Sequence, residues 1–166
     1  MGASRSSAVL LTGPVGSGKT AAAAAAVPLL AERSAAIDLD WLAWFSAPGA
    51  TVDEMLADNL HAVWANLRRA GVERLVLARH VPTREALCPI EAALGGVELR
   101  TVRLELPREL LERRVRARDE GAELDEHLAL IAADAVAERF EDARVQPDGL
   151  TPSEVARAAL RAVGWL

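Results

Sequence analysis

The stretch Gly13-Pro14-Val15-Gly16-Ser17-Gly18-Lys19-Thr20 decides the fold of this chain. It matches the pattern G-x-x-x-x-G-K-[ST], in which glycines let successive backbone N–H groups turn toward the oxygens of a phosphate group. A helix that starts at the end of such a loop adds the positive end of its dipole. In this pattern Lys19 reaches the β- and γ-phosphates, and the Thr20 hydroxyl joins the shell of a Mg²⁺ ion.

The segments on both sides of the loop fit this interpretation. Residues 6–12 are typical of a short buried strand, and Ala21 to Ala26 are strong helix formers. Strand, loop and helix are the context that the motif requires. Lys19 is also the only lysine of the chain, and a planar guanidinium does not replace a compact ammonium among phosphates. The sequence therefore predicts a phosphate-binding loop rather than a chance glycine-rich turn.

Length and composition are typical of one globular domain over residues 1–166. Of these residues 51% are hydrophobic and 26% are charged, which is enough to bury a core. The formal net charge is −5 and no block of basic residues stands out, so nucleic acid is not a favoured partner. The sequence contains no apolar run of membrane-spanning or signal-peptide type. This predicts a cytoplasmic protein without a membrane partner.

Strand and helix patterns alternate along the whole chain. The predicted strands cover residues 6–12, 35–39, 74–78, 98–106 and 143–146. The predicted helices cover about 19–33, 52–70, 83–94, a segment from 107, about 125–140, and a last segment around 155–163. This alternation predicts an α/β fold, in which helices cover both faces of an open parallel sheet.

In open parallel sheets, ligands bind beyond the carboxyl ends of the strands. That rule places several polar segments around one crevice: the phosphate-binding loop, Asp38 with Asp40, Arg79 with His80, and the turn over residues 147–152. Asp38 and Asp40 are two positions apart in an extended segment, so their side chains project to the same side. Both carboxylates can therefore face a bound phosphate.

At this level the chain resembles the small P-loop kinases of metabolites, the group that includes shikimate kinase and gluconate kinase. Four landmarks carry the resemblance: the loop Gly13 to Thr20, the paired-Asp segment Ile37 to Asp40, the Arg-bearing helix Leu110 to Arg118, and the closing segment Arg144 to Ala156. The resemblance covers nearly the whole length. It implies the three-layer fold of that superfamily, with strand order 2-3-1-4-5 and a short lid at about 118–126.

The resemblance also implies ATP-dependent phosphorylation of a small molecule, with ATP and Mg²⁺ as cofactors. Carried over by position, Asp40 is the base at the acceptor hydroxyl, and Asp38 joins Thr20 on the metal side. Lys19 and Arg118 stabilise the transferring group. Residues 13–20 bind the nucleotide. Arg114 of the Arg-bearing helix and Asp148 of the closing segment are further nucleotide contacts.

Several of these residues have structural alternatives. Asp38 and Asp40 can instead cap the helix that follows them. Arg114 and Arg118 lie on one helix face, and neighbouring acids can form a solvated, salt-bridged helix with them. The aromatic segment after the Asp pair, which contains Trp41, Trp44 and Phe45, can either wall an acceptor pocket or pack in the core on Trp64.

The chain departs from the kinase pattern at the end of its third strand. Leu77-Ala78-Arg79-His80 carries no acidic residue in the Walker B position. Arg79 and His80, together with Trp41 and Trp44, are candidate contacts to the small-molecule acceptor. Two alternative functions stay open: a nucleotide-binding module that hydrolyses ATP slowly, and a nucleoside or nucleotide kinase.

Overall fold

The fold is built around five parallel strands. The structure is a computed structural model that describes residues 6–134 and 138–166. The sheet has the order β2-β3-β1-β4-β5, as predicted. Its strands are β1 (Ser7–Thr12), β2 (Ser34–Asp38), β3 (Arg74–Ala78), β4 (Glu98–Leu104) and β5 (Ala143–Val145). All four neighbouring pairs are parallel, so the carboxyl ends of the strands meet at one edge.

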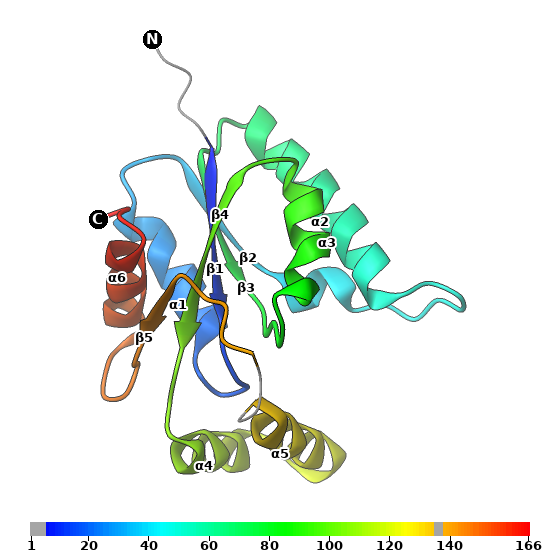
Figure 1. Ribbon diagram of the computed structural model, residues 1–166, viewed down its shortest axis with the longest axis vertical. Helices are drawn as coiled ribbons and strands as arrows, with labels where there is room; N and C mark the ends of the chain where they lie inside the picture. Colours follow the sequence, from blue (N-terminus) through cyan, green and yellow to red (C-terminus); the bar gives the residue numbers. More distant parts are fainter. Residues whose placement is uncertain (1–5, 135–137) are drawn as a thin grey trace.

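Helices cover both faces of the sheet, and one helix pair lies beyond its carboxyl edge (Figure 1). α1 (Lys19–Ala26) and α6 (Pro152–Ala162) pack on one face, and α2 (Val52–Arg69) and α3 (Cys88–Leu94) on the other. α4 (Arg108–Arg118) and α5 (Gly121–Asp134) lie beyond the strand ends. Three short 3₁₀ segments complete the described elements: Val27–Leu29, Leu39–Ala43 and Glu85–Leu87.

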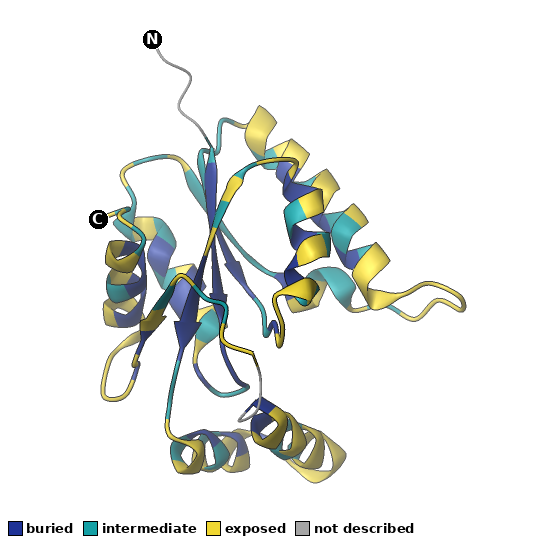
Figure 2. Ribbon diagram, viewed as in Figure 1, coloured by how far each residue is buried: buried dark blue, intermediate teal, exposed yellow. Residues whose placement is uncertain are grey.

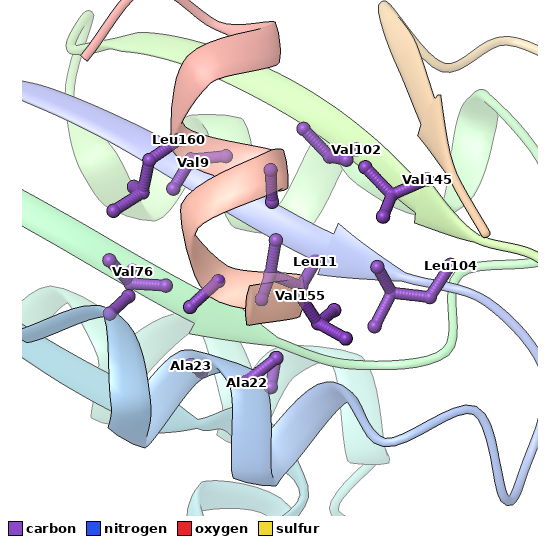
Figure 3. Packing of buried hydrophobic residues seen from close by; sticks show 14 residues of the cluster. Val9, Leu11, Ala22, Ala23, Val76, Val102, Leu104, Val145, Val155 and Leu160 are labelled. Carbon is purple, nitrogen blue, oxygen red and sulfur yellow. The ribbon is translucent and has the colours of Figure 1, made fainter. Parts of the chain in front are cut away.

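The central strand β1 is buried on both of its faces, as Figure 2 shows. Val9 and Leu11 belong to the core cluster under α1 and α6 (Figure 3), whereas Ala8 and Leu10 belong to the cluster under α2 and α3. Alternate residues of a strand point to opposite faces. A continuous apolar strand is therefore the pattern of a parallel sheet that helices cover on both sides.

The start of α2 follows the sequence signal, but other helix ends differ from the prediction. α2 begins at Val52, within the predicted range, where Thr51 and Glu54 form a capping box. α1 ends at Ala26 instead of about residue 33, because Pro28 cannot continue the α-helical hydrogen bonds. α3 begins at Cys88, after a 3₁₀ turn, rather than at residue 83.

The segment predicted as a short lid, about 118–126, is mostly helical. α5 begins at Gly121 and ends at Asp134, so the predicted helix over 125–140 is shifted toward the N-terminus. Residues 135–137 of that prediction lie outside the described residues. Only Asp119 and Glu120 separate α4 from α5. Within the described part of the chain, no helix combines the length and the apolar character needed to cross a membrane.

Candidate functional site

The loop between β1 and α1 has a backbone that its glycines make possible. Gly13, Gly16 and Gly18 have φ values of 134°, 82° and 91°, which side-chain-bearing residues rarely adopt. A Cβ atom at Gly13 would clash with the carbonyl oxygen of Leu104 in β4. At Gly18 a Cβ atom would meet nothing within 4 Å. The loop is thus packed against the sheet on one side and open at the N-terminus of α1, where an anion is favoured.

Two polar side chains of the loop fit an anionic ligand. The Lys19 Nζ donates a hydrogen bond to the carbonyl oxygen of Pro14 at 3.0 Å. The Ser17 hydroxyl is buried and has no hydrogen-bond partner among the described residues. A buried hydroxyl without a partner costs free energy, and a phosphate oxygen would supply one. This unpartnered group supports the prediction that the loop binds phosphate.

Asp38 connects the end of β2 to the loop. Its Oδ2 accepts a hydrogen bond from the Thr20 hydroxyl at 2.5 Å, and its Oδ1 accepts one from the backbone N–H of Asp40 at 3.0 Å. Asp38 therefore caps the Leu39–Ala43 segment, as the structural alternative expected, and it also contacts Thr20, while its role at a metal stays a prediction. A hydroxyl and a carboxylate are oxygen ligands of the kind that Mg²⁺ accepts while it keeps several waters.

Asp40 shares a pocket with Lys19. The pocket has a volume of about 450 Å³, and its lining includes Lys19, Thr20, Asp40 and Arg118. Asp40 is exposed, and its Oδ1 lies 3.0 Å from the Arg79 guanidinium. Arg79 follows β3, the strand that pairs with β2, which explains why the ends of these two strands meet here.

His80 supports the loop from the same strand end. Its Nδ1 lies 3.1 Å from the carbonyl oxygen of Gly13 and 3.9 Å from the Asp134 carboxylate at the end of α5. Burial lowers the pKa of His80, because desolvation penalises the charged imidazolium. His80 also lines the pocket that contains Lys19, so the structure places it at the floor of the candidate site.

The structure places the two candidate arginines of α4 differently. Arg114 donates a hydrogen bond to the carbonyl oxygen of Gly16 at 3.1 Å. It also lines a cavity of about 200 Å³ together with Pro147 and Leu150, which belong to the turn over residues 147–152 that was predicted to border the crevice. Arg118 instead makes two hydrogen bonds to the Asp119 carboxylate, at 2.5 and 2.9 Å.

Asp148, the other predicted nucleotide contact, lies apart from Arg114. It lines a different cavity, of about 370 Å³, with Pro14, Arg103 and Asp134. Asp148 therefore does not share the lining of the cavity between Arg114 and Pro147. The sequence held a signal for the cavity between Arg114 and Pro147. Pro147 follows β5, and the ring of a proline is rigid.

The aromatic pair after Asp40 faces solvent. Trp41 and Trp44 are exposed, their ring centroids are 5.0 Å apart, and they line a cavity of about 420 Å³ with Asp40 and Arg79. Trp64, by contrast, is buried in the core cluster under α2 and α3. The alternative that Trp41 and Trp44 are core aromatics is therefore wrong.

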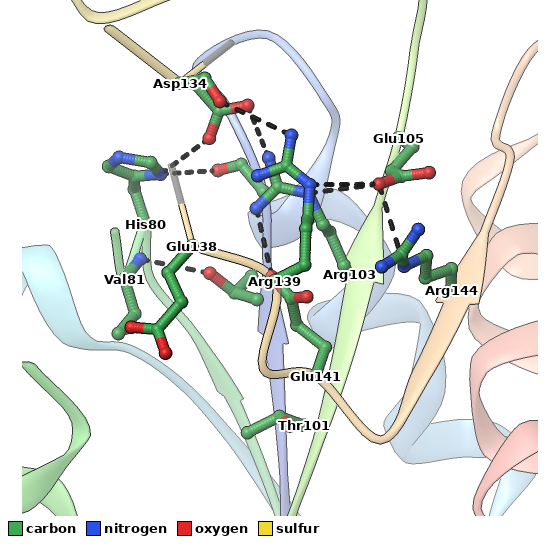
Figure 4. A network of polar contacts seen from close by, with 12 residues as sticks. His80, Val81, Thr101, Arg103, Glu105, Asp134, Glu138, Arg139, Glu141 and Arg144 are labelled. Atoms are coloured by element: carbon green, nitrogen blue, oxygen red, sulfur yellow. Dashed lines mark hydrogen bonds and ion pairs between the residues drawn. The ribbon is translucent and has the colours of Figure 1, made fainter. Parts of the chain in front are cut away.

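The sequence reasoning missed a buried ionic cluster beside the loop, shown in Figure 4. Arg103 on β4 is almost completely buried and hydrogen-bonds Asp134 of α5. Its guanidinium also pairs with Glu141 at 3.1 Å and lies 3.4 Å from Glu105. Because Asp134 also faces His80, the cluster links α5 to the sheet and to the floor of the site.

A second set of possible metal ligands lies just after α4 and on the first turns of α5. Asp119, Glu123 and His127 each offer a ligand atom, and these atoms lie within 4.8 Å of one another. Arg118 already neutralises Asp119, and this ion pair lowers the pKa of that carboxyl to about 2, with His127 as a further hydrogen-bond partner. Asp119 is thus already paired with the protein's own side chains, and the assignment of Thr20 and Asp38 to a metal stays a prediction.

The charge of Lys19 gives a pH dependence that can be measured. Burial lowers the pKa of Lys19 to about 8, and the nearby carboxylates of Asp40 and Asp38 offset part of this effect. An ATP-bound site requires the ammonium form, so above the pKa each binding event must also take up a proton. The dissociation constant of ATP is therefore expected to rise by up to about tenfold per pH unit above about pH 8.

Titrations of an ATP analogue between about pH 7 and about pH 9.5 would measure this slope. The matched control is Lys19→Arg, whose guanidinium stays charged over this range, so its binding should be weaker but flat with pH. A wild-type affinity that also stays flat would contradict the assignment of Lys19 as the titrating phosphate ligand.

Comparison with known proteins gives similarity in structure but not in sequence. No protein-family model and no curated protein sequence matches the chain. The Deinococcus radiodurans tunicamycin resistance protein matches with a TM-score of 0.68 and 19% identity over 96% of each chain. A gluconokinase from Sinorhizobium meliloti 1021 matches with a TM-score of 0.64 and 18% identity, covering 97% of this chain and 93% of the other.

A third similar structure is the Mycobacterium tuberculosis APS kinase in complex with AMPPNP and APS. It has a TM-score of 0.64 and 22% identity, and the match covers 97% of this chain and 99% of that one. The loop, the sheet order and these matches agree over nearly the full length. The chain therefore has the fold of the P-loop small-molecule kinases, as the sequence resemblance predicted.

Proposed function

We propose that the chain is an ATP-dependent phosphotransferase that acts on a hydroxyl group of a small molecule. The observation that carries the proposal is a pair of hydrogen bonds to Asp38, one from the Thr20 hydroxyl and one from the backbone N–H of Asp40. These hydrogen bonds hold the Asp38 carboxylate, with Asp40 two residues on, beside the end of the phosphate-binding loop. Nucleotide capture alone needs the loop, but phosphoryl transfer to an alcohol also needs a group that receives the proton of that alcohol.

In the proposed reaction the acceptor oxygen attacks the γ-phosphorus of ATP. The bond from that phosphorus to the β,γ-bridging oxygen breaks, a bond to the acceptor oxygen forms, and ADP leaves. The hydroxyl proton passes to the Asp40 carboxylate, which Arg79 holds in place at 3.0 Å. Lys19 compensates the charge on the transferring phosphoryl group.

Two further sets of residues complete the proposal. Thr20 and Asp38 would hold Mg²⁺, which supplies positive charge to the phosphate oxygens. The adenine would lie in the cavity between Arg114 and Pro147, since a guanidinium stacks on a flat ring. Arg118 would reach the transferring group only after it leaves Asp119. The predicted cytoplasmic location stays a prediction.

A metabolite-pool assay tests this function. The purified chain is incubated with ATP, Mg²⁺ and pools of hydroxylated metabolites, and mass spectrometry follows the gain of one phosphoryl group. ADP release is expected to depend on a particular pool and to match the amount of phosphorylated product. Lys19→Met is the control that should remove both signals, because it deletes the ammonium but keeps a side chain of similar length.

The second candidate is a module that binds ATP and hydrolyses it slowly. The end of β3 favours it, because Arg79 and His80 stand where an acidic residue would hold a metal-bound water. Such a module would release ADP at the same slow rate with and without any acceptor pool. A nucleoside or nucleotide kinase is a special case of the first proposal, and the same assay would identify it by its product.

A further inference from the structure

Exposed apolar side chains gather at one place on the described surface. Of the six large hydrophobic residues that are exposed in the described part of the chain, Trp41, Trp44 and Val52 line the same cavity. Their exposed fractions are 67%, 77% and 49%. Apolar surface that is concentrated in a hollow indicates a ligand site rather than ordinary scattered exposure.

Local structure explains why the two indoles point outward together. Leu39–Ala43 is a 3₁₀ segment in which Leu39 is fully buried. Residues three apart lie on the same side of such a segment, so Trp41 and Trp44, the residue that caps the segment, lie on a different side from the buried Leu39. Their planes are inclined by 54°. This arrangement offers flat faces on which a ring can stack.

The charges around this cavity cancel. Arg79 and Asp40 are the charged residues that line it, and they form an ion pair at 3.0 Å. The Arg79 side chain is mostly buried, so it is held in this pair. A carboxylate, sulfate or phosphate on the acceptor would call for a cation that is free to bind it. No such cation is present among the described residues that line this cavity.

Asp40 borders both this cavity and the pocket of the phosphate site, which contains Lys19 and Thr20. A ring that lies on Trp41 and Trp44 can therefore present a hydroxyl to Asp40 on the side that faces the loop. The cavity volume of about 420 Å³ falls within the range of small-molecule sites.

We infer that the acceptor is an uncharged molecule with a flat apolar ring face and a hydroxyl group next to it, bound on Trp41 and Trp44. This inference rests on the proposed function and narrows its substrate class. Both an aromatic ring and the C–H face of a neutral sugar offer this chemistry. Acidic metabolites lie outside the class.

Four matched compounds separate ring character from charge: glucose, glucuronate, phenyl β-glucoside and phenyl β-glucuronide. ATP-dependent phosphorylation of each is measured as kcat/KM, and binding is measured separately by quenching of tryptophan fluorescence. Each neutral compound is expected to exceed its acidic partner by at least about tenfold in affinity or kcat/KM. A phenyl compound that exceeds glucose would identify an aromatic ring as the source of the stacking face, and the reverse order would identify a sugar.

Substitutions locate the effect. Trp41→Ala combined with Trp44→Ala is expected to weaken acceptor binding by at least roughly tenfold and leave the KM for ATP unchanged. Trp41→Phe combined with Trp44→Phe should restore most of the affinity, because the flat faces are kept. Leu130→Ala removes an exposed apolar side chain outside the cavity and serves as the matched control.

Two results would overturn the inference: equal or better use of the acidic compounds, or unchanged acceptor binding in the double alanine variant. In the first case, phosphorylation of glucuronate would still uphold the proposed function. The opposite outcome is also possible: neutral compounds quench the fluorescence of Trp41 and Trp44, but neither they nor any metabolite pool gains a phosphoryl group. That outcome would uphold the ring site and contradict the kinase.

Discussion

Asp40→Asn is expected to lower the rate of phosphoryl transfer by roughly 10²–10⁴-fold. Asparagine keeps the size of the side chain and can still accept a hydrogen bond, but it cannot take up the acceptor proton. Binding of ATP should change by less than about threefold, because the loop contacts are made by other residues. Steady-state transfer and separate titration with an ATP analogue would measure the two quantities.

The loss of rate must be tied to the position of Asp40 rather than to charge in general. Asp58→Asn makes the same change on the exposed face of α2 and should leave transfer unchanged. Asp38→Asn should act differently, because Asp38 contacts Thr20. It is expected to raise the Mg²⁺ concentration needed for half-maximal rate. Full transfer by Asp40→Asn would show that the proton goes elsewhere and would remove Asp40 from its proposed role.

Features that depend on local sequence could be predicted well. Gly13 to Thr20 form a loop whose conformation is set by its own glycines, and Asp38 ends a strand that the apolar pattern delimits. The order of the strands followed from the resemblance to kinases, because topology is shared within a fold. The end of α1 was also a local feature, and Pro28 gave a signal that the prediction overlooked.

Features that depend on distant residues could not be predicted. Arg103 lies in a strand of alternating polar and apolar residues, and this pattern gives no sign that its side chain is buried. Its burial results from Asp134 and Glu141, which are 31 and 38 residues further along the chain. Arg118 pairs with its neighbour Asp119, and Asp119 also contacts His127, eight residues further along in α5. The spacing of residues along the chain predicts neither the burial of Arg103 nor the partner of Arg118.

The buried cluster around Arg103 gives the largest expected effect on stability. Arg103→Met is expected to lower the free energy of unfolding by about 3–5 kcal/mol. The substitution leaves the carboxylates of Asp134 and Glu141 without their cation, and their side chains are only 9% and 0% exposed. Denaturant unfolding followed by circular dichroism would measure the change.

A control on the same strand separates burial from loss of charge. Arg100 also lies on β4 and pairs with Glu98 at 2.9 Å, but its side chain is 52% exposed. Arg100→Met should therefore cost no more than about 1 kcal/mol. If Arg103→Met proved equally mild, the ion pairs of the cluster would have no net role in holding the fold.

The cluster also has a local consequence, because Asp134 is the last described residue of α5. Removing the Arg103 guanidinium frees Asp134 from β4, and hydrogen exchange of the α5 amides should then accelerate more than that of the β1 amides. Glu141→Gln added to Arg103→Met should recover part of the lost stability, since it removes one of the carboxylates that lack a partner. Suppose that the free energy of unfolding recovers while hydrogen exchange of the α5 amides stays fast. The lost stability would then come from the unpaired Glu141 carboxylate, and the bond between Arg103 and Asp134 would be what holds α5 in place.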